Sequence, residues 1–397
     1  MKRLLPLLVL CGLLAAQTSL EYKEKYKDPV HAKIKALREN AETEENDPGE
    51  KPEYTLFASL AGMEYPVSQD IFTTCFHFPP KHQGLTSTCW AHAGISFIES
   101  EVQKKQNTEI KLSVMYVVYH EYLEKALAFI ESKGKQELRL GSQISSVFDI
   151  ADTWGLVPEA DYTGNPTPEG FDTKAMTDAL RACLDEMSGQ NNWDKDLAVP
   201  AIRAILDKHL GKVPETVSYG GKTYTPKNFY KKVLKFRPMQ YTAIQSTLSH
   251  PFFEYRELPF PDNWRHDDMY LNLPVDAFYH AIRRAVKDGC TVPIGGDTSE
   301  PGYNRYAGIA FIPVADVPAD DIDDDVREYR IYGGSTGDDH AVHIVGYAEF
   351  NGEDWFLIKD SSRSAYTSDH PGYYFYRGDY IRLKMLTAVL PNEYVGY

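Results

Sequence analysis

Gln83-Gly84-Leu85-Thr86-Ser87-Thr88-Cys89-Trp90-Ala91-His92 is the stretch that decides the fold, because it joins a polar, turn-prone run to a cysteine that opens an apolar helical pattern. Cys89 is the best candidate nucleophile of the chain. At the first turn of a helix, the free backbone N–H groups and the positive end of the dipole favour a thiolate. Gln83 precedes it and can donate its side-chain amide to an oxyanion near the sulfur. The alternative is a buried structural cysteine, since free cysteines are among the most buried residues.

The composition is that of a globular protein. The chain has 397 residues, 43% hydrophobic and 13% aromatic, which is enough for a large core in one large domain with insertions or in two modest ones. Its formal net charge is −15 and its pI is about 5.3. Nucleic-acid affinity rests largely on Lys and Arg that neutralise phosphates, so this balance argues against a nucleic-acid partner.

The N-terminal sequence predicts export. Residues 1–19 begin with Lys2 and Arg3, continue with an apolar run and end in small and polar residues, the layout of a secretory signal peptide. No later stretch is long and apolar enough to span a bilayer, so we expect an exported, periplasmic or extracellular protein. Residues 20–66 are rich in charge and are interpreted as a solvated arm or linker, with an inhibitory pro-segment as the alternative.

The cysteines are too few and too far apart in the sequence to form a disulfide-bonded scaffold. Besides Cys11, which lies in the signal, the chain has only Cys75, Cys89, Cys183 and Cys290, and none of them belongs to a zinc-binding motif. If Cys89 stays a thiol, at most one disulfide can form among the other three. We therefore expect neither a metal site nor a cofactor.

The order of elements predicts an α+β fold, with helices first and a sheet last. Apolar residues recur at helical spacing over 89–102, on a helix expected to be buried on one side, and again over 112–129, 144–154, 175–187, 201–210 and 274–286. A hairpin is predicted at 217–224, and β-branched and aromatic runs predict strands at 342–347, 355–359, 373–376 and 383–390. The acidic run 320–325 is interpreted as a solvated loop rather than a calcium site. A domain over 67–397 would then comprise a helical half (83–165), an insertion (166–270) and a β half (271–397).

A thiolate nucleophile needs a base that holds its proton and later protonates the leaving amine, and histidine suits both steps. His340 stands directly before a predicted strand, at the mouth of the sheet. Asp360 follows the next strand, which the turn Asn351-Gly352 joins to the first. The two ends of such a hairpin meet, so Asp360 can hold the second imidazole nitrogen.

Other interpretations of these residues stay open. Taken alone, His340 is a surface-loop histidine and Asp360 a turn former at the end of a strand. His92, one helical turn after Cys89, is the rival base. His343 is expected to face the other side of its strand and to be packed.

Six ordered segments resemble the papain-like cysteine peptidases: Gln83, Cys89-Trp90, Leu112-Ser113, Gly141-Ser142, His340-Ala341-Val342 and Trp355 to Asp360. Four further stretches resemble the bleomycin hydrolase and aminopeptidase C branch in its exported bacterial form: His250-Pro251-Phe252, Pro261-Asp262-Asn263-Trp264, Asn272-Leu273-Pro274 and Gly296-Asp297-Thr298-Ser299-Glu300. The long separation of Cys89 from His340 agrees with this branch, since the papain signature spans only about 130–150 residues.

The resemblance implies a helical half that carries Cys89, a β-barrel-like half that carries His340, a cleft between them and a helical insertion in the middle. It implies that Gln83 contributes to the oxyanion hole, that Cys89 is the nucleophile and that His340 is the general base and acid. Asp360 stands where the family usually has asparagine. The residues expected to border the substrate are Trp90, Gly141, Ser142 and Asp339.

The resemblance also implies peptide substrates and exopeptidase action at free N-termini. In that branch the protein is a homo-oligomer, a hexamer. The C-terminal tail, here residues 391–397, is expected to lie in the cleft and to limit access to it.

This chain departs from the family pattern after Asp360. The sequence Asp360-Ser361-Ser362-Arg363 replaces the usual Asn-Ser-Trp-Gly, so the indole that shields the acceptor from water is missing. A carboxylate can orient an imidazole as an amide does, and its charge should raise the pKa of the imidazole. Thr86 stands where papain has a bridging cysteine, and the charged arm is longer than this branch usually needs.

Two other functions fit part of the pattern. The altered loop after Asp360 would suit a catalytically impaired papain-like protein that binds peptides without cleaving them. Transglutaminase-type acyl transfer uses a similar Cys–His pair, but the spacing between Gln83 and Cys89-Trp90 favours the peptidase.

Overall fold

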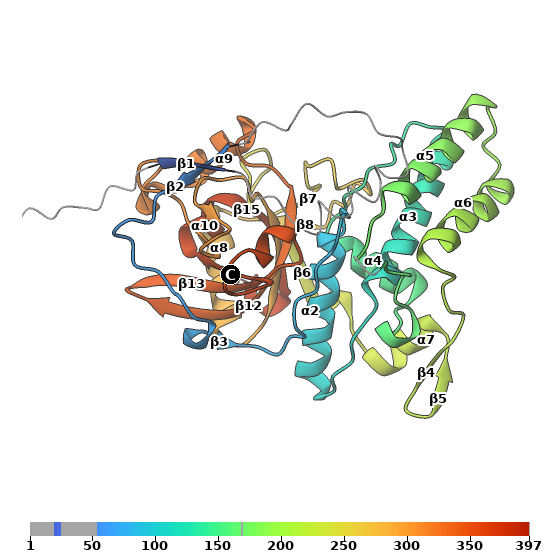
Figure 1. Ribbon diagram of the computed structural model, residues 1–397, viewed down its shortest axis with the longest axis horizontal. Helices are drawn as coiled ribbons and strands as arrows, with labels where there is room; N and C mark the ends of the chain where they lie inside the picture. Colours follow the sequence, from blue (N-terminus) through green and yellow to red (C-terminus); the bar gives the residue numbers. More distant parts are fainter. Residues whose placement is uncertain (1–19, 25–53, 168–169, 397) are drawn as a thin grey trace, which may run out of the picture.

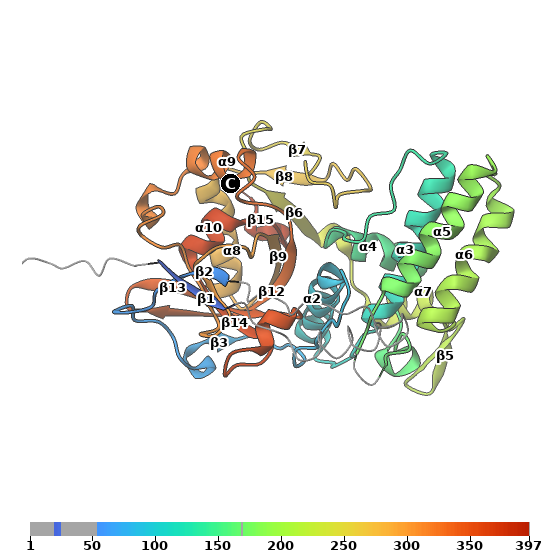
Figure 2. The same ribbon diagram turned by 45° about the horizontal axis from the view of Figure 1, so that its top comes forward.

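A computed structural model describes residues 20–24, 54–167 and 170–396. The predicted signal peptide and residues 25–53 of the charged arm lie outside the described residues. Most helices from the first part of the chain gather at one end of the molecule, the large sheet and the helices of the last third lie at the other, and helix α2 (Cys89–Gln106) stands between them (Figures 1 and 2). The predicted α+β fold is confirmed.

Helix α2 begins at Cys89, as predicted, and ends before Asn107, whose left-handed backbone (φ 49°) lets its N–H donate to the carbonyl of Gln103. The prediction of one-sided burial is wrong, because every residue from Ala93 to Val102 is buried. The helix contacts α3 (Val114–Glu131) and α4 (Ser145–Trp154) of the helical half as well as strands β9 (Val292–Gly296) and β12 (His340–Phe350) of the sheet. Neighbours on both sides therefore bury both faces.

Four of the predicted helices lie at the helical end, and two of them come from the insertion. The helices there are α3 (Val114–Glu131), α4 (Ser145–Trp154), α5 (Lys174–Gly189), α6 (Lys195–Leu210) and the short α7 (Pro226–Phe229), with the predicted hairpin at β4 (Val217–Tyr219) and β5 (Lys222–Tyr224). Ser113 caps α3 by accepting from the N–H of Tyr116, and Gly155 ends α4. Helices α5 and α6 share one hydrophobic cluster with α3.

The large sheet follows the order β10-β11-β14-β13-β12-β9-β15-β6-β8-β7, with β3 (Thr73–Thr74) paired to β12. The other strands are β6 (Tyr241–Gln245), β7 (Tyr255–Arg256), β8 (Tyr270–Asn272), β10 (Tyr303–Asn304), β11 (Ile309–Ala310), β13 (Glu353–Lys359), β14 (Tyr373–Arg377) and β15 (Met385–Pro391). Among the described strands, β10 and β7 end the path without pairing to each other. The β half is therefore an open sheet and not the barrel-like structure that the resemblance implied.

The hairpin of β12 and β13 is formed as predicted. Asn351 and Gly352 both have positive φ (52° and 81°), which the tight turn of a two-residue hairpin requires. In this register His343 lies opposite Lys359. Asp360, one residue further on, therefore comes beside the beginning of β12.

Two helices in the last third were not predicted, α9 (Asp324–Tyr332) and α10 (Gly378–Lys384). The acidic run is therefore not simply a solvated loop. The Asp323 side chain caps α9 by accepting from the N–H of Val326, and Asp324 accepts from the N–H of Val275 at the start of α8 (Val275–Lys287). Aspartate is favoured at such helix starts, where it accepts from free N–H groups.

The described ends of the predicted arm are strands. Strand β1 (Leu20–Glu24) pairs antiparallel with β2 (Tyr54–Ala58). Phe57 and Ala58 are buried, and the N–H of Ala58 donates to the carbonyl of Pro301. This end of the arm therefore packs on the β half instead of forming a solvated linker.

The C-terminal tail does not lie in the cleft, so that expectation is wrong for residues 391–396. The guanidinium of Arg284 on α8 lies over the ring of Tyr394 and also donates to the carbonyl of Glu393. These contacts hold the tail against α8. Within the described residues, no helix has the length and apolar character needed to cross a membrane.

Candidate active site

One cavity lies where the start of α2 meets the start of β12. It is lined by most of the residues that the sequence predicts to take part in catalysis or in substrate binding. Its volume is about 200 Å³, and its lining includes all of the predicted site residues except Asp360, namely Gln83, Cys89, Trp90, Gly141, Ser142, Asp339 and His340. Asp360 lies behind His340, and its side chain is completely buried. Segments from both halves of the chain thus form one site.

Cys89 is the first residue of α2, so its backbone N–H has no partner inside the helix. The side chain is half-buried and is a free thiol. It lines the same cavity as His340, whose pKa it helps to raise. This combination of a helix start and an adjacent imidazole is how proteins activate a thiol as a nucleophile.

The imidazole of His340 joins the thiol to a carboxylate. Its Nε2 lies 2.8 Å from Oδ1 of Asp360, which leaves Nδ1 for Cys89. Burial by itself lowers the pKa of His340, but the Asp360 carboxylate outweighs this effect and, together with the neighbouring Cys89, holds that pKa well above its ordinary value. The structure therefore favours a protonated imidazole beside the sulfur.

Asp360 is held by several donors. Its Oδ1 accepts from the N–H of Ser362 at 2.7 Å, and its Oδ2 accepts from the hydroxyl groups of Ser362 at 3.0 Å and Tyr303 at 3.3 Å. Burial raises the pKa of this carboxyl group, but His340 and Ser362 more than offset it and keep the pKa below its usual range. Asp360 is thus an ionised carboxylate.

Buried tyrosines cover Asp360 where the family has an indole. The ring of Tyr303 packs on the ring of Tyr374, with centroids 4.5 Å apart, and also contacts the rings of Tyr376 and Tyr380. All four side chains are buried. The absence of tryptophan after Ser361 therefore does not open the carboxylate to water. No sequence signal pointed to Tyr303, because it lies in β10, outside the hairpin that carries the site.

The oxyanion loop, residues 83–88, is tied to the segment after Asp360. Nε2 of Gln83 donates to the carbonyl of Thr86 at 2.8 Å, and Oε1 of Gln83 accepts from the hydroxyl of Ser361 at 2.7 Å. An amide NH₂ group has two hydrogens, so one remains to donate toward the cavity. Together with the N–H of Cys89, Gln83 can form a two-donor oxyanion hole.

The walls of the cavity differ in part from expectation. Trp90 is buried and its indole donates to the carbonyl of Ser87, so it supports the oxyanion loop more than it offers surface to a substrate. The hydroxyl of Ser142 points away to Glu121. Asp339 is exposed at the rim, where the N–H of Thr298 donates to its carboxylate. Of the predicted wall residues, the backbone of 141–142 and the Asp339 side chain are best placed to touch a substrate.

Two further carboxylates line the cavity and were not predicted, Asp262 and Asp338. Asp262 explains the glycine at 141, because a Cβ on Gly141 would lie 1.9 Å from Oδ2 of Asp262. Burial, opposed by a hydrogen bond from Gln143, raises the pKa of Asp338 to about 7. In the sequence, the stretch around Asp262 resembles a peptidase branch, but nothing there gave Asp262 a role in the site. Asp262 and Asp338 are also far apart in the chain, so the sequence does not indicate that they line the same wall.

A buried charge cluster on α3 holds the loop that carries Asp262. Glu121, which is 1% exposed, accepts from the indole of Trp264 at 2.6 Å and from the guanidinium of Arg265 at 2.5 Å. It also accepts from the Ser142 hydroxyl and lies 3.8 Å from Nζ of Lys125. One carboxylate thus connects two walls of the cavity to the same helix.

Replacing Glu121 with alanine is expected to destabilise the protein by about 3–5 kcal/mol, because it leaves the buried charge of Lys125 without its carboxylate partner and removes one of the carboxylates that bind Arg265. Urea denaturation followed by tryptophan fluorescence measures the loss. Glu124→Ala is the matched control, since Glu124 also binds Arg265 but its side chain is 20% exposed. Equal losses in the two variants would contradict the role given to Glu121.

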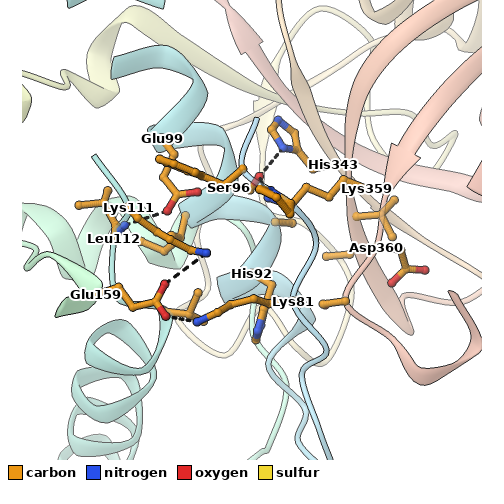
Figure 3. A pocket seen from close by; sticks show the side chains of 18 residues that line it. Lys81, His92, Ser96, Glu99, Lys111, Leu112, Glu159, His343, Lys359 and Asp360 are labelled. Atoms are coloured by element: carbon orange, nitrogen blue, oxygen red, sulfur yellow. Dashed lines mark hydrogen bonds and ion pairs between the residues drawn. The ribbon is translucent and has the colours of Figure 1, made fainter. Parts of the chain in front are cut away.

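The rival histidines lie elsewhere. His92 does not line the Cys89 cavity; its Nδ1–H donates to the carbonyl of Thr88, and burial lowers its pKa to about 4. His343 is buried, as predicted, with Nδ1 2.9 Å from the hydroxyl of Ser96. Both line a second cavity behind α2 (Figure 3).

The second cavity is lined by several charged side chains but has no room for a peptide. Figure 3 shows Glu99 bonded to the N–H of Leu112, and Glu159 between Lys81 and Lys111. Its volume of about 40 Å³ is enough for a few water molecules at most. The Cys89 cavity is therefore the candidate substrate site.

The remaining cysteines form no bridge in the described part of the chain, where Cys75, Cys183 and Cys290 are free thiols. The described residues also contain no cluster of three or more histidine, cysteine or acidic side chains arranged to bind a metal ion.

Comparisons with known proteins found similar structures but no similar sequences. No protein-family model and no curated protein sequence matches the chain. Among solved structures, PepW from Lactobacillus rhamnosis HN001 (DR20) matches with a TM-score of 0.64 and 15% identity, over 83% of each chain.

Two weaker matches are a structure from work on the mite allergens Blo t 1 and Der p 1 (TM-score 0.41, 15% identity, 85% of this chain and 75% of that one) and procathepsin L 3 of Tenebrio molitor larval midgut (TM-score 0.38, 13% identity, 83% and 71%). All three are papain-like, and the likeness to PepW confirms the predicted papain-like fold. At this identity it shows the fold alone.

Proposed function

We propose that this chain, a protein of the papain-like fold, is a cysteine peptidase that hydrolyses peptide bonds through a thioester on Cys89. The observation that carries the proposal is that Cys89 and His340 line one cavity and that the His340 imidazole is bonded to the buried Asp360. Nucleophile, base and orienting group in hydrogen-bond reach of one another are the geometric requirement for acyl transfer.

In the first step, the Cys89 sulfur attacks the peptide carbonyl carbon, and the carbonyl electron pair moves to the oxygen. The amide of Gln83 and the N–H of Cys89 stabilise the oxyanion. As the tetrahedral intermediate collapses, the imidazolium of His340 gives its proton to the amide nitrogen. The C–N bond breaks, the amine leaves, and an acyl thioester remains on Cys89.

In the second step, His340 takes a proton from water while the water oxygen attacks the thioester carbonyl. The C–S bond breaks, the acid product leaves, and the sulfur and imidazole return to their starting state. Asp360 keeps the ring oriented through both steps and stabilises its positive charge.

We further propose that the enzyme is aminopeptidase-like. Asp262, Asp338 and Asp339 line the cavity beside Cys89, and no Lys or Arg is among its described lining residues. A carboxylate-lined wall next to the nucleophile favours an ammonium group over a blocked, uncharged N-terminus. This supports cleavage after the first residue of a peptide with a free N-terminus.

Hydrolysis of free and N-acetylated dipeptide amides by the protein without residues 1–19 tests this specificity. We expect kcat/KM to favour the free amine about tenfold or more, the value of one charge-assisted hydrogen bond. Asp338→Asn and Asp262→Asn should each reduce this preference, whereas Asp196→Asn, an exposed change on α6, should not. Equal rates on both substrates would exclude the aminopeptidase, and binding without turnover would favour the catalytically impaired peptide-binding protein.

Export and oligomerisation also remain proposals. The sequence pattern of residues 1–19 supports a cleaved signal peptide, which N-terminal sequencing of the secreted protein would reveal. The hexamer rests on the resemblance alone, and light scattering measures it directly.

A further inference from the structure

The face of α2 that carries Cys89 also carries polar side chains further along the helix. His92, Ser96 and Glu99 follow Cys89 at helical spacing, so all four side chains lie on one face. Ser96 and Glu99 are buried, although serine and glutamate are mostly exposed in proteins. With residues of β12 and β13 they line the second cavity, behind α2 (Figure 3). The hairpin of β12 and β13 is therefore the neighbour that this face meets.

The hydroxyl of Ser96 bonds to both strands of this hairpin. Nζ of Lys359 in β13 donates to Oγ of Ser96 at 2.8 Å, and Nδ1 of His343 in β12 lies 2.9 Å from the same oxygen. His343 and Lys359 stand directly opposite each other in the register of the hairpin, and Figure 3 shows both side chains meeting at Ser96. One side chain of α2 thus joins the helix to two strands.

A hydroxyl suits this junction because it can accept one hydrogen bond while it donates another. Burial lowers the pKa of His343 well below its ordinary value, so the ring is neutral and its Nδ1 can accept from Ser96. The amine of Lys359 is the donor on the other side. An alanine at position 96 would take this partner away from both groups at once, which costs free energy because they lie in the interior.

The junction at Ser96 lies on the same elements as the proposed catalytic residues. Ser96 follows Cys89 by seven residues, which is about two turns of α2. Lys359 directly precedes Asp360, and the other strand of the hairpin, β12, begins at His340. Close-packed interiors transmit strain, so a shift at the junction also moves the catalytic side chains on these elements.

We infer that Ser96 is a positioning residue: its hydroxyl holds the β12–β13 hairpin against α2 and thereby sets the place of His340 and Asp360 relative to Cys89. This inference rests on the proposed function. Ser96 does not line the Cys89 cavity and so touches no substrate there. Because a misplacement of about 1 Å can cost about a hundredfold in rate, the loss of this junction slows the chemistry without weakening substrate binding.

Replacing Ser96 with alanine tests the inference. Kinetics on an aminoacyl arylamide should show kcat lowered about tenfold or more and KM nearly unchanged, because the junction acts on the reacting groups and not on the bound substrate. Ser96→Thr keeps the hydroxyl and should retain most of kcat. Ser100→Ala is the matched control, since Ser100 is also a buried serine of α2 but its hydroxyl donates to the carbonyl of Ser96 within the same helix.

The rate at which a thiol-directed epoxide labels Cys89 gives a second readout, which depends on the thiolate and its imidazolium but on no peptide substrate. It should fall in Ser96→Ala by a similar factor and stay unchanged in Ser100→Ala. If circular dichroism shows that Ser96→Ala does not fold, Lys359→Gln and Lys359→Met replace it. The amide of glutamine can still donate to Ser96 and the thioether of methionine cannot, so the methionine variant should be the slower one on both measures.

Unchanged kcat and labelling in Ser96→Ala would overturn the inference. Equal losses in Ser96→Ala and Ser100→Ala, a change confined to KM, or equal rates for the two Lys359 variants would overturn it as well. Failure of the proposed function looks different, because the unaltered protein would then hydrolyse no arylamide. The labelling comparison still decides the role of Ser96 in that case, since it needs only the thiol and its base.

Discussion

Replacing Cys89 with alanine is expected to lower the hydrolysis of aminoacyl arylamides by at least about 10⁴-fold, the loss seen when the nucleophile of a catalytic set is removed. The thioester cannot form without the sulfur, and the remaining oxyanion donors cannot activate water by themselves. The same variant should lose labelling by a thiol-directed epoxide. Activity assays and mass spectrometry of the labelled protein measure both effects.

The matched control is Cys183→Ala, which removes another partly exposed thiol, on α5. That variant should keep both the activity and the epoxide label, because Cys183 does not line the Cys89 cavity. Undiminished activity of Cys89→Ala would refute the assignment of the nucleophile. Undiminished labelling of Cys89→Ala would place the reactive thiol elsewhere.

Replacing Asp360 with asparagine is expected to shift the alkaline limit of activity to lower pH. The carboxylate holds the pKa of His340 above its ordinary value, so the imidazolium that the first step requires persists as the pH rises past that value. An amide keeps the hydrogen bond but not the charge, and the imidazolium is then lost at lower pH. Between about pH 6 and pH 9 the variant should lose about tenfold more activity than the unaltered protein, the worth of one charged hydrogen bond.

The pH profile of kcat/KM measures this shift, and the rate of epoxide labelling over the same range reports the thiolate directly. Asp369→Asn is the control, because it removes an exposed carboxylate from the segment between β13 and β14 without touching the Cys89 cavity. Superimposable profiles for Asp360→Asn and the unaltered protein would show that the carboxylate acts only as a hydrogen-bond acceptor.

Much of the candidate site could be predicted from the sequence because its signals are local. A helix that starts at Cys89 follows from the apolar periodicity after a turn-prone run. The meeting of His340 and Asp360 follows from the turn at Asn351-Gly352, since turn type fixes the register of a short hairpin and thus which ends meet.

The predictions that proved wrong concern segments whose surroundings are formed by residues far away in the sequence. The burial of α2 on all sides depends on β9 and β12 packing against the helical half. The helix α9 was missed because its start is stabilised by aspartates, which also suit a solvated loop. The tail was expected in the cleft, but contacts with Arg284 on α8 hold it elsewhere.

The sequence by itself determined that Cys89 stands at a helix start, that His340 and Asp360 meet on one hairpin, and that these parts follow a papain-like order, because each depends on neighbours within a few residues or on one turn. Only the tertiary structure decided what surrounds them. The cover of Tyr303 over Asp360 and the acidic wall with Asp262 and Asp338 each join segments far apart in the chain. Packing of the sheet and α3 brings those segments together, and no local periodicity records such long-range contacts.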